Sequence, residues 1–124
     1  MKFIIEPYSI NFEVYYTSDP KRLVKSILKR KPDLKIIEEL RKDWIDLDAG
    51  ASVCAGQIRG NYTIIAIFDK EAIKDYHESY LAHEAVHVLS YVMKYTGIKY
   101  DFDNDEPHAY IVDGIVQMMV RAKS

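Results

Sequence analysis

The stretch "YTIIAIF", residues 62–68, is the part of the sequence from which the fold can be worked out. Its last five residues are all apolar, and a short unbroken apolar run of this kind predicts a strand buried on both faces. The preceding segment 51–58, "ASVCAGQI", also has strand character, and "RGN" at 59–61 supplies residues that tolerate positive φ. We therefore expect a β-hairpin whose second strand is deeply buried.

Upstream of this hairpin the pattern predicts two strands followed by two helices. Segments 2–5 and 10–16 are rich in β-branched and aromatic residues, which favours strands. "SDP" at 18–20 is typical of a helix start, and apolar residues then recur at helical spacing as far as Pro32. A second helix is expected from Asp33 to about Asp43, with three residues facing inward: Leu34, Ile37 and Leu40.

Downstream of the hairpin the pattern is helical. One long helix is expected from about Ile73 to Tyr95, with an apolar stripe and a stop at Gly97, and Pro107 opens a last helix. This order predicts an α+β fold in a single domain, residues 1–124. We expect a small mixed or antiparallel sheet packed on the long helix and on the C-terminal helix that follows it.

Composition narrows the function classes. The 124-residue chain has a formal net charge of −2, so we expect no nucleic-acid partner. The basic segment 21–31, "KRLVKSILKRK", is interpreted as a solvated helix face in preference to a phosphate-binding patch. No apolar run is long enough to cross a membrane, and the single cysteine, Cys54, favours a reducing compartment. We expect a cytoplasmic protein without a membrane partner; the oligomeric state is not predicted.

The motif "HEAVH", residues 83–87, is the strongest functional signal. His83 and His87 are four residues apart, so on a helix both imidazoles can reach one metal ion, and Glu84 is angled toward a water bound to that ion. Zinc suits such a site because it accepts imidazole ligands and tetrahedral geometry. The alternative is a pair of histidines on a helix surface that binds no metal.

A catalytic zinc site usually has three protein ligands, so a third must come from elsewhere. The segment 103–114, "DNDEPHAYIVDG", opens the next helix and offers Glu106 and His108. Glu106 shares a helix face with Tyr110 and Asp113, whereas His108 points elsewhere in a regular helix. We expect Glu106 to be the ligand and keep His108 as the alternative; Cys54 and His77 are candidates by residue type alone.

These residues resemble the zincin metallopeptidases, and specifically the branch with a glutamate as third ligand, the gluzincins. Glu106 follows His87 by nineteen positions, close to the spacing of that branch. "HEAVHV" followed by "EPHAYIVDGIVQMM" is also similar to a group of small zincin-like proteins encoded by phages and prophages. The resemblance covers about a third of the chain, from Tyr76 to Met119. We expect no counterpart of the second lobe and downstream domain of larger gluzincins.

The resemblance and the residues together predict zinc-dependent hydrolysis of a peptide or protein substrate. His83, His87 and Glu106 would hold Zn²⁺, and Glu84 would act as general base on the zinc-bound water. Tyr110 would donate a hydrogen bond to the tetrahedral oxyanion. The alternative is a catalytically silent binding or structural protein with the zincin fold, for example a phage accessory protein, in which zinc stabilises the helix pair.

Overall fold

The computed structural model describes residues 1–123, and the position of Ser124 lies outside it. The strands are β1 (Lys2–Ile5), β2 (Ile10–Thr17), β3 (Ala51–Ile58) and β4 (Asn61–Asp69). The helices are α1 (Pro20–Leu28), α2 (Leu34–Leu40), the π-helical segment η1 (Arg41–Asp46), α3 (Lys70–Ile73), α4 (His77–Thr96) and α5 (Glu106–Lys123). Within residues 1–123, no helix combines the length and the apolar character that crossing a bilayer requires.

The strands form one mixed sheet in the order β1-β2-β4-β3. β1 pairs antiparallel with β2, β2 pairs parallel with β4, and β4 pairs antiparallel with β3. The predicted hairpin is confirmed: β3 and β4 are joined by Arg59 and Gly60, whose φ angles of 52° and 81° suit a tight two-residue turn. The α+β class predicted from the sequence is also confirmed, and β3 lies at one edge of the sheet.

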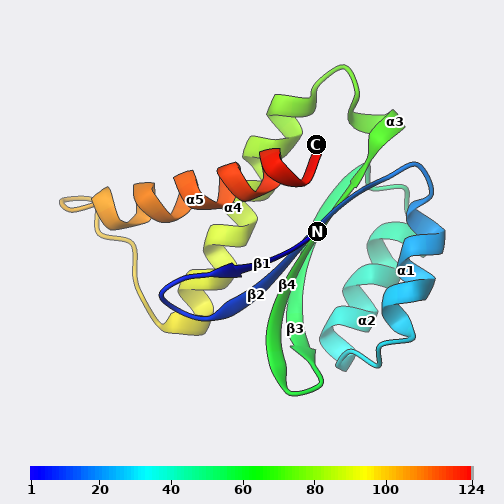
Figure 1. The fold of residues 1–124 in the computed structure, drawn as a ribbon, viewed down its shortest axis with the longest axis horizontal. Coiled ribbons are helices and arrows are strands. Elements are labelled where there is room, and N and C mark those ends of the chain that lie inside the picture. Colours follow the sequence, from blue (N-terminus) through cyan, green and yellow to red (C-terminus); the bar gives the residue numbers. More distant parts are fainter. Residues whose placement is uncertain (124) are drawn as a thin grey trace.

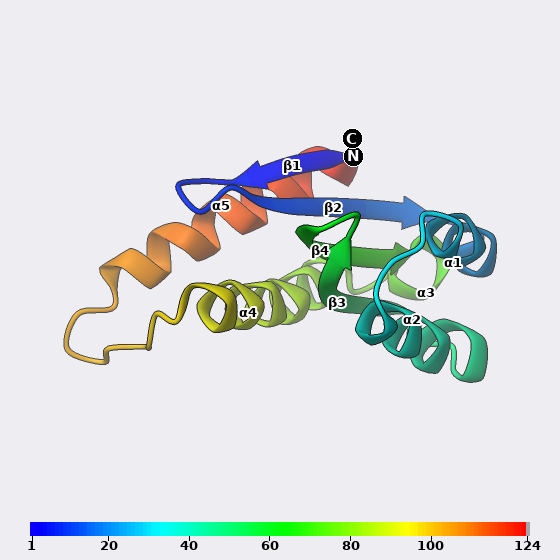
Figure 2. The ribbon, with the colours of Figure 1, turned by 90° about the horizontal axis from the view of Figure 1, so that it is seen from below.

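Burial of β4 on both faces organises the molecule in three layers. Ile64, Ala66 and Phe68 point to one face, where they join the apolar cluster formed with α4 and α5. Ile65 and Ile67 point to the other face and pack in a second cluster with α1, α2 and η1. Figures 1 and 2 show α1 and α2 on one side of the strands and α4 and α5 on the other. The sequence predicted that the long helix and the C-terminal helix, α4 and α5, pack on the sheet. The structure shows in addition that α1 and α2 cover its opposite face.

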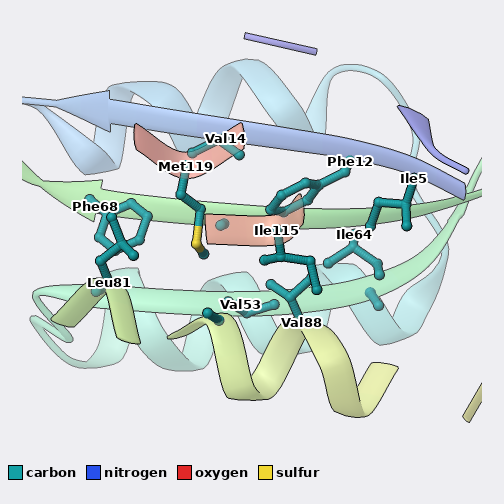
Figure 3. Packing of buried hydrophobic residues seen from close by; sticks show 14 of the residues in the cluster. Ile5, Phe12, Val14, Val53, Ile64, Phe68, Leu81, Val88, Ile115 and Met119 are labelled. Carbon is teal, nitrogen blue, oxygen red and sulfur yellow. The ribbon is translucent and has the colours of Figure 1, made fainter. Parts of the chain in front are cut away.

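The long helices pack on the sheet through regular apolar stripes. Leu81, Ala85, Val88 and Val92 of α4 are all at most 6% exposed, as the helical spacing predicted. Figure 3 shows Leu81 and Val88 beneath β3 and β4, while Ile115 and Met119 of α5 lie against Phe12 and Val14 of β2. The Tyr16 hydroxyl donates a hydrogen bond to the Met119 carbonyl oxygen at 3.0 Å, which fixes the C-terminal half of α5 on β2.

Two helix predictions need correction. The helix expected from Ile73 to Tyr95 is two helices, because the chain turns after α3 and α4 begins only at His77. The inward position expected for Leu34 is wrong, since this side chain is 67% exposed. Leu40 is buried as predicted. Asp33 caps α2, and the helix starts in a phase that turns Ile36 to the sheet in place of Leu34.

Asp33 also ties α2 to the free edge of β3. Its carboxylate accepts hydrogen bonds from the backbone N–H of Ile36 at 3.1 Å and from that of Gln57 at 2.8 Å. Its own N–H donates to the Gln57 carbonyl oxygen at 2.9 Å. A Cβ atom at Gly56 would collide with the Asp33 carboxylate, so only glycine lets the two segments approach this closely.

A Gly56→Ala substitution tests this clamp. We expect it to lower the free energy of unfolding by about 1–3 kcal/mol, because the new methyl group must displace a carboxylate that is held by two backbone N–H groups. Gly114→Ala is the matched control: its Cβ meets nothing within 4 Å in α5, so it should raise stability by about 0.5–1 kcal/mol. Equal effects of the two changes in urea denaturation would contradict the clamp.

A partly buried ion pair links the segment just after α1 to the sheet. Glu13 of β2 is 3% exposed, and its carboxylate binds both terminal nitrogens of the Arg30 guanidinium and accepts a hydrogen bond from the Tyr15 hydroxyl. Burial alone would raise the pKa of Glu13, but the hydrogen bonds and charge of Arg30 outweigh it and hold this pKa below the usual range.

This lowered pKa predicts an acid-sensitive stability. The contribution of Glu13 is fully present above the glutamate pKa of the unfolded chain, about 4.3, and is lost as the pH falls toward the lower folded pKa. Glu13→Gln should cost about 2 kcal/mol at pH 7, because it removes charged hydrogen bonds to a partly exposed arginine, and it should flatten the fall in stability between about pH 4.5 and 2.5. The measurement is thermal unfolding across this pH range. If the stability of the two proteins falls equally steeply with decreasing pH, Glu13 is not the source of the acid sensitivity.

Candidate metal centre

His83 and His87 lie one turn apart on α4, and the structure brings their imidazoles together as the motif predicted. Their Nε2 atoms are 3.2 Å apart. Two nitrogen ligands, each about 2.0–2.1 Å from a zinc ion in tetrahedral geometry, would be separated by about 3.3 Å. The side chain of His83 is 68% exposed, so the imidazoles are accessible from solvent. The pair can therefore supply two ligands to one metal ion with little rearrangement.

Glu84 combines deep burial with an unsatisfied carboxylate. Only 5% of the residue is exposed, and among the described residues its Oε2 atom has no hydrogen-bond partner. Its Oε1 atom is 4.0 Å from His83 Nε2. Burial raises the pKa of Glu84, with the charge of His83 opposing this shift and that of Asp43 adding to it. A carboxylate left unpaired in such a place costs stability, which favours a functional explanation for its retention.

The pair and Glu84 face a hollow at the edge of the sheet. This cavity of about 300 Å³ is bounded by α4, by the edge strand β3 and by the α2–η1 segment. Its lining includes the side chains His83, Glu84, His87, Tyr91, Ser52, Val53, Glu39 and Asp43.

The wall opposite α4 is acidic. Glu39 and Asp43 are four residues apart across the α2–η1 junction and both line the hollow. Burial raises the pKa of Asp43, and the charge of Glu39 raises it further. Asp43 belongs to η1, which is held at this edge by a 2.7 Å hydrogen bond from Trp44 Nε1 to the Ser52 hydroxyl. Sequence reasoning missed both acids, although their spacing of four on a predicted helix placed them on one face.

The residues predicted on the last helix lie elsewhere. Glu106 and Tyr110 are exposed, Tyr110 at 72%, and neither lines the hollow. α5 begins at Glu106, and Figures 1 and 2 show its first turns projecting beyond the sheet. Throughout residues 1–123, no three side chains of the types His, Cys, Asp and Glu stand close enough together to hold a metal ion. The prediction that Glu106 completes the ligand set is therefore not confirmed.

The other candidate ligands are also separate from the pair. His108 is 5% exposed and packs against the Tyr100 ring, with centroids 4.8 Å apart and both ring nitrogens without a described partner. His77 Nε2 lies 3.4 Å from the Tyr16 hydroxyl, and Cys54 is buried in the second apolar cluster. Burial raises the pKa of the Cys54 thiol to about 12, which disfavours the thiolate that a zinc ion binds.

Comparisons with protein-family models, with curated protein sequences and with solved structures found no match to this chain. Function must accordingly be inferred from the site itself.

Metal binding by the pair can be tested by zinc content. His83→Ala and His87→Ala should each lower zinc affinity by at least about tenfold, whereas His77→Ala, a histidine of the same helix outside the hollow, should leave it unchanged. Asp43→Ala should weaken binding more than Glu106→Ala, because only Asp43 lines the hollow with the pair. The measurement is zinc titration with a competing chelator. If His83→Ala and His87→Ala bind zinc as tightly as the wild-type protein, the pair is excluded as ligands.

Proposed function

We propose that this protein is a zinc-dependent metallopeptidase-like hydrolase. The observation that carries the proposal is the 3.2 Å approach of His83 and His87 Nε2 beside the buried carboxylate of Glu84, whose Oε2 atom has no hydrogen-bond partner among the described residues. Two accessible imidazoles alone would suit any metal-binding surface. An adjacent carboxylate that is buried without a partner is what a hydrolytic site needs and what a structural metal site does not.

The two imidazoles suit a zinc ion, and the third ligand would have to move to reach it. His83 and His87 would hold the ion, and the third ligand would be an acid, either Glu106 as the motif spacing suggests or Asp43 from the wall of the hollow. When bound, zinc supplies a Lewis acid and a water molecule whose pKa is lowered to about 7. The hollow leaves room for both water and substrate, since its volume is about 300 Å³.

Glu84 would serve as the proton carrier. Its Oε2 atom has no competing donor among the described residues, so it is free to take a proton from water in the hollow and pass it to the leaving amine. Its carboxylate is held in place by burial between α4 and the sheet. Tyr110 is 72% exposed, and no residue of α5 lines the hollow. In this geometry α5 therefore supplies no hydrogen-bond donor to the oxyanion.

The free edge of β3 offers a binding mode for an extended peptide. The end of this edge near Gln57 is occupied by Pro32 and Asp33. Gln57 points its N–H and C=O outward, so by the two-residue alternation of a strand Val53 and Ala55 do the same. Val53 also lines the hollow. A peptide added to this edge would pass directly by His83 and Glu84.

A Glu84→Gln variant separates the proposed hydrolase from a structural zinc protein. It should keep its zinc but lose hydrolysis of a mixed synthetic decapeptide library by at least about 100-fold, because only the proton carrier has changed. Glu78→Gln, an exposed glutamate on the same helix, and Tyr110→Phe should both keep the wild-type rate.

Mass spectrometry of the library is the measurement. Full activity in Glu84→Gln would contradict the proposed mechanism. Stoichiometric zinc in a wild-type protein that cleaves no library member would favour the alternative, a zincin-like binding protein whose metal is structural.

A further inference from the structure

A second cavity lies on the opposite face of the sheet from α4. It has a volume of about 410 Å³ and is lined by residues of β1, β2, β4 and the β3–β4 turn, together with Arg30 just after α1. Among the residues that line it are Lys2, Asn11, Glu13, Arg30, Arg59 and Thr63. None of these belongs to the hollow that holds the histidine pair.

The sheet changes character at this cavity. Under α1 and α2 the face is apolar, with Ile65 and Ile67 in the second cluster. Two residues earlier in β4 the same face carries Thr63, which is 2% exposed and pairs in register with Asn11 of β2. A polar floor of this kind is what a ligand with hydrogen-bonding groups requires, and it would be a poor surface for packing another helix.

The charges around the cavity do not balance. Lys2, Arg30 and Arg59 are basic and Glu13 is acidic, so the lining carries three positive charges and one negative charge. The one carboxylate is already committed, since Glu13 binds both terminal nitrogens of Arg30. Within residues 1–123, Lys2 and Arg59 form no ion pair. Lys2 lies opposite Glu13 across the β1–β2 pair without forming an ion pair with it, and Arg59 has no acidic partner in the lining, so the cavity keeps an excess of positive charge.

We propose that this cavity binds a small organic molecule with a phosphate or carboxylate group. Lys2 and Arg59 would pair with the oxyanion, and the Asn11 amide would donate a further hydrogen bond. Ile4 and Ile58, which also line the cavity, would contact the carbon skeleton. The Glu13–Arg30 pair forms a rigid part of the wall, so the site is largely preformed.

The test uses the full chain labelled with ¹⁵N and two probes, inorganic phosphate and succinate, each titrated at constant ionic strength. We expect saturable shifts of the amide signals of Asn11 and Thr63, and the tighter probe identifies the anion class. Lys2→Gln/Arg59→Gln should weaken binding at least about tenfold, because both cation contacts are lost.

Arg41→Gln/Lys99→Gln is the matched control, since it removes one arginine and one lysine that are exposed elsewhere on the surface. It should leave the affinity unchanged, and melting temperatures close to wild type in both double variants would show that folding is intact.

Three results would overturn the proposal: absence of a saturable shift with either probe, equal weakening by the two double variants, or shifts that map away from the cavity. A ten-residue oligothymidylate separates the cavity from the basic surface of α1. Suppose that the oligonucleotide shifts only the signals of α1 while phosphate and succinate leave the amide signals of Asn11 and Thr63 unchanged. That result would show that the basic residues of α1 bind polyanions and that the cavity is not an anion site.

Discussion

The rest of the structure depends on the burial of β4 on both of its faces. Residues 64–68 are all fully buried, and each burial of an aliphatic side chain contributes on the order of 1.5–3 kcal/mol. A strand with two apolar faces needs a layer of helices on each, so α1 and α2 must pack on one side and α4 and α5 on the other. Its backbone also needs a hydrogen-bonded strand on each side. These strands are β2 and β3, and β3 is the edge of the sheet.

This constraint fixes the rotation of α4 and with it the candidate site. Once Leu81, Ala85 and Val88 face the sheet, positions 83 and 87 must face outward, and position 84 falls at the boundary between core and solvent. Glu84 is consequently buried yet borders the hollow beside β3. The motif, the apolar stripe and the edge strand thus belong to one arrangement, in which packing energy holds the polar residues in position.

The features that the sequence could predict are those set by local periodicity. The unbroken run at 64–68 predicted the buried strand, and the spacing of four predicted the contact between His83 and His87. What could not be predicted depends on how elements are placed relative to one another. α5 is anchored by Ile115 and Met119 in its C-terminal half, while its first turns, which begin at Glu106, project beyond the sheet. The spacing of residues along the chain does not reveal how α5 is placed relative to α4.

The acidic wall of the hollow illustrates the same limit. Asp43 precedes His83 by forty residues, and nothing near either residue in the sequence links them. They line the same hollow because α2 and η1 are clamped to β3 by Asp33 and Trp44 while α4 approaches the same strand from the other face. A local motif can therefore predict that two histidines lie side by side, while the residues that surround them are known only from the packed structure.

The central claim is that the pair on α4 and the hollow at β3 form one zinc site with Glu84 beside it. The most direct test is anomalous X-ray diffraction at the zinc absorption edge from crystals of the zinc-loaded protein. A zinc site of this kind predicts one strong anomalous peak within about 2.0–2.2 Å of Nε2 of both His83 and His87, on the side of the hollow. A peak held by other residues, or none in crystals grown with equimolar zinc, would contradict it.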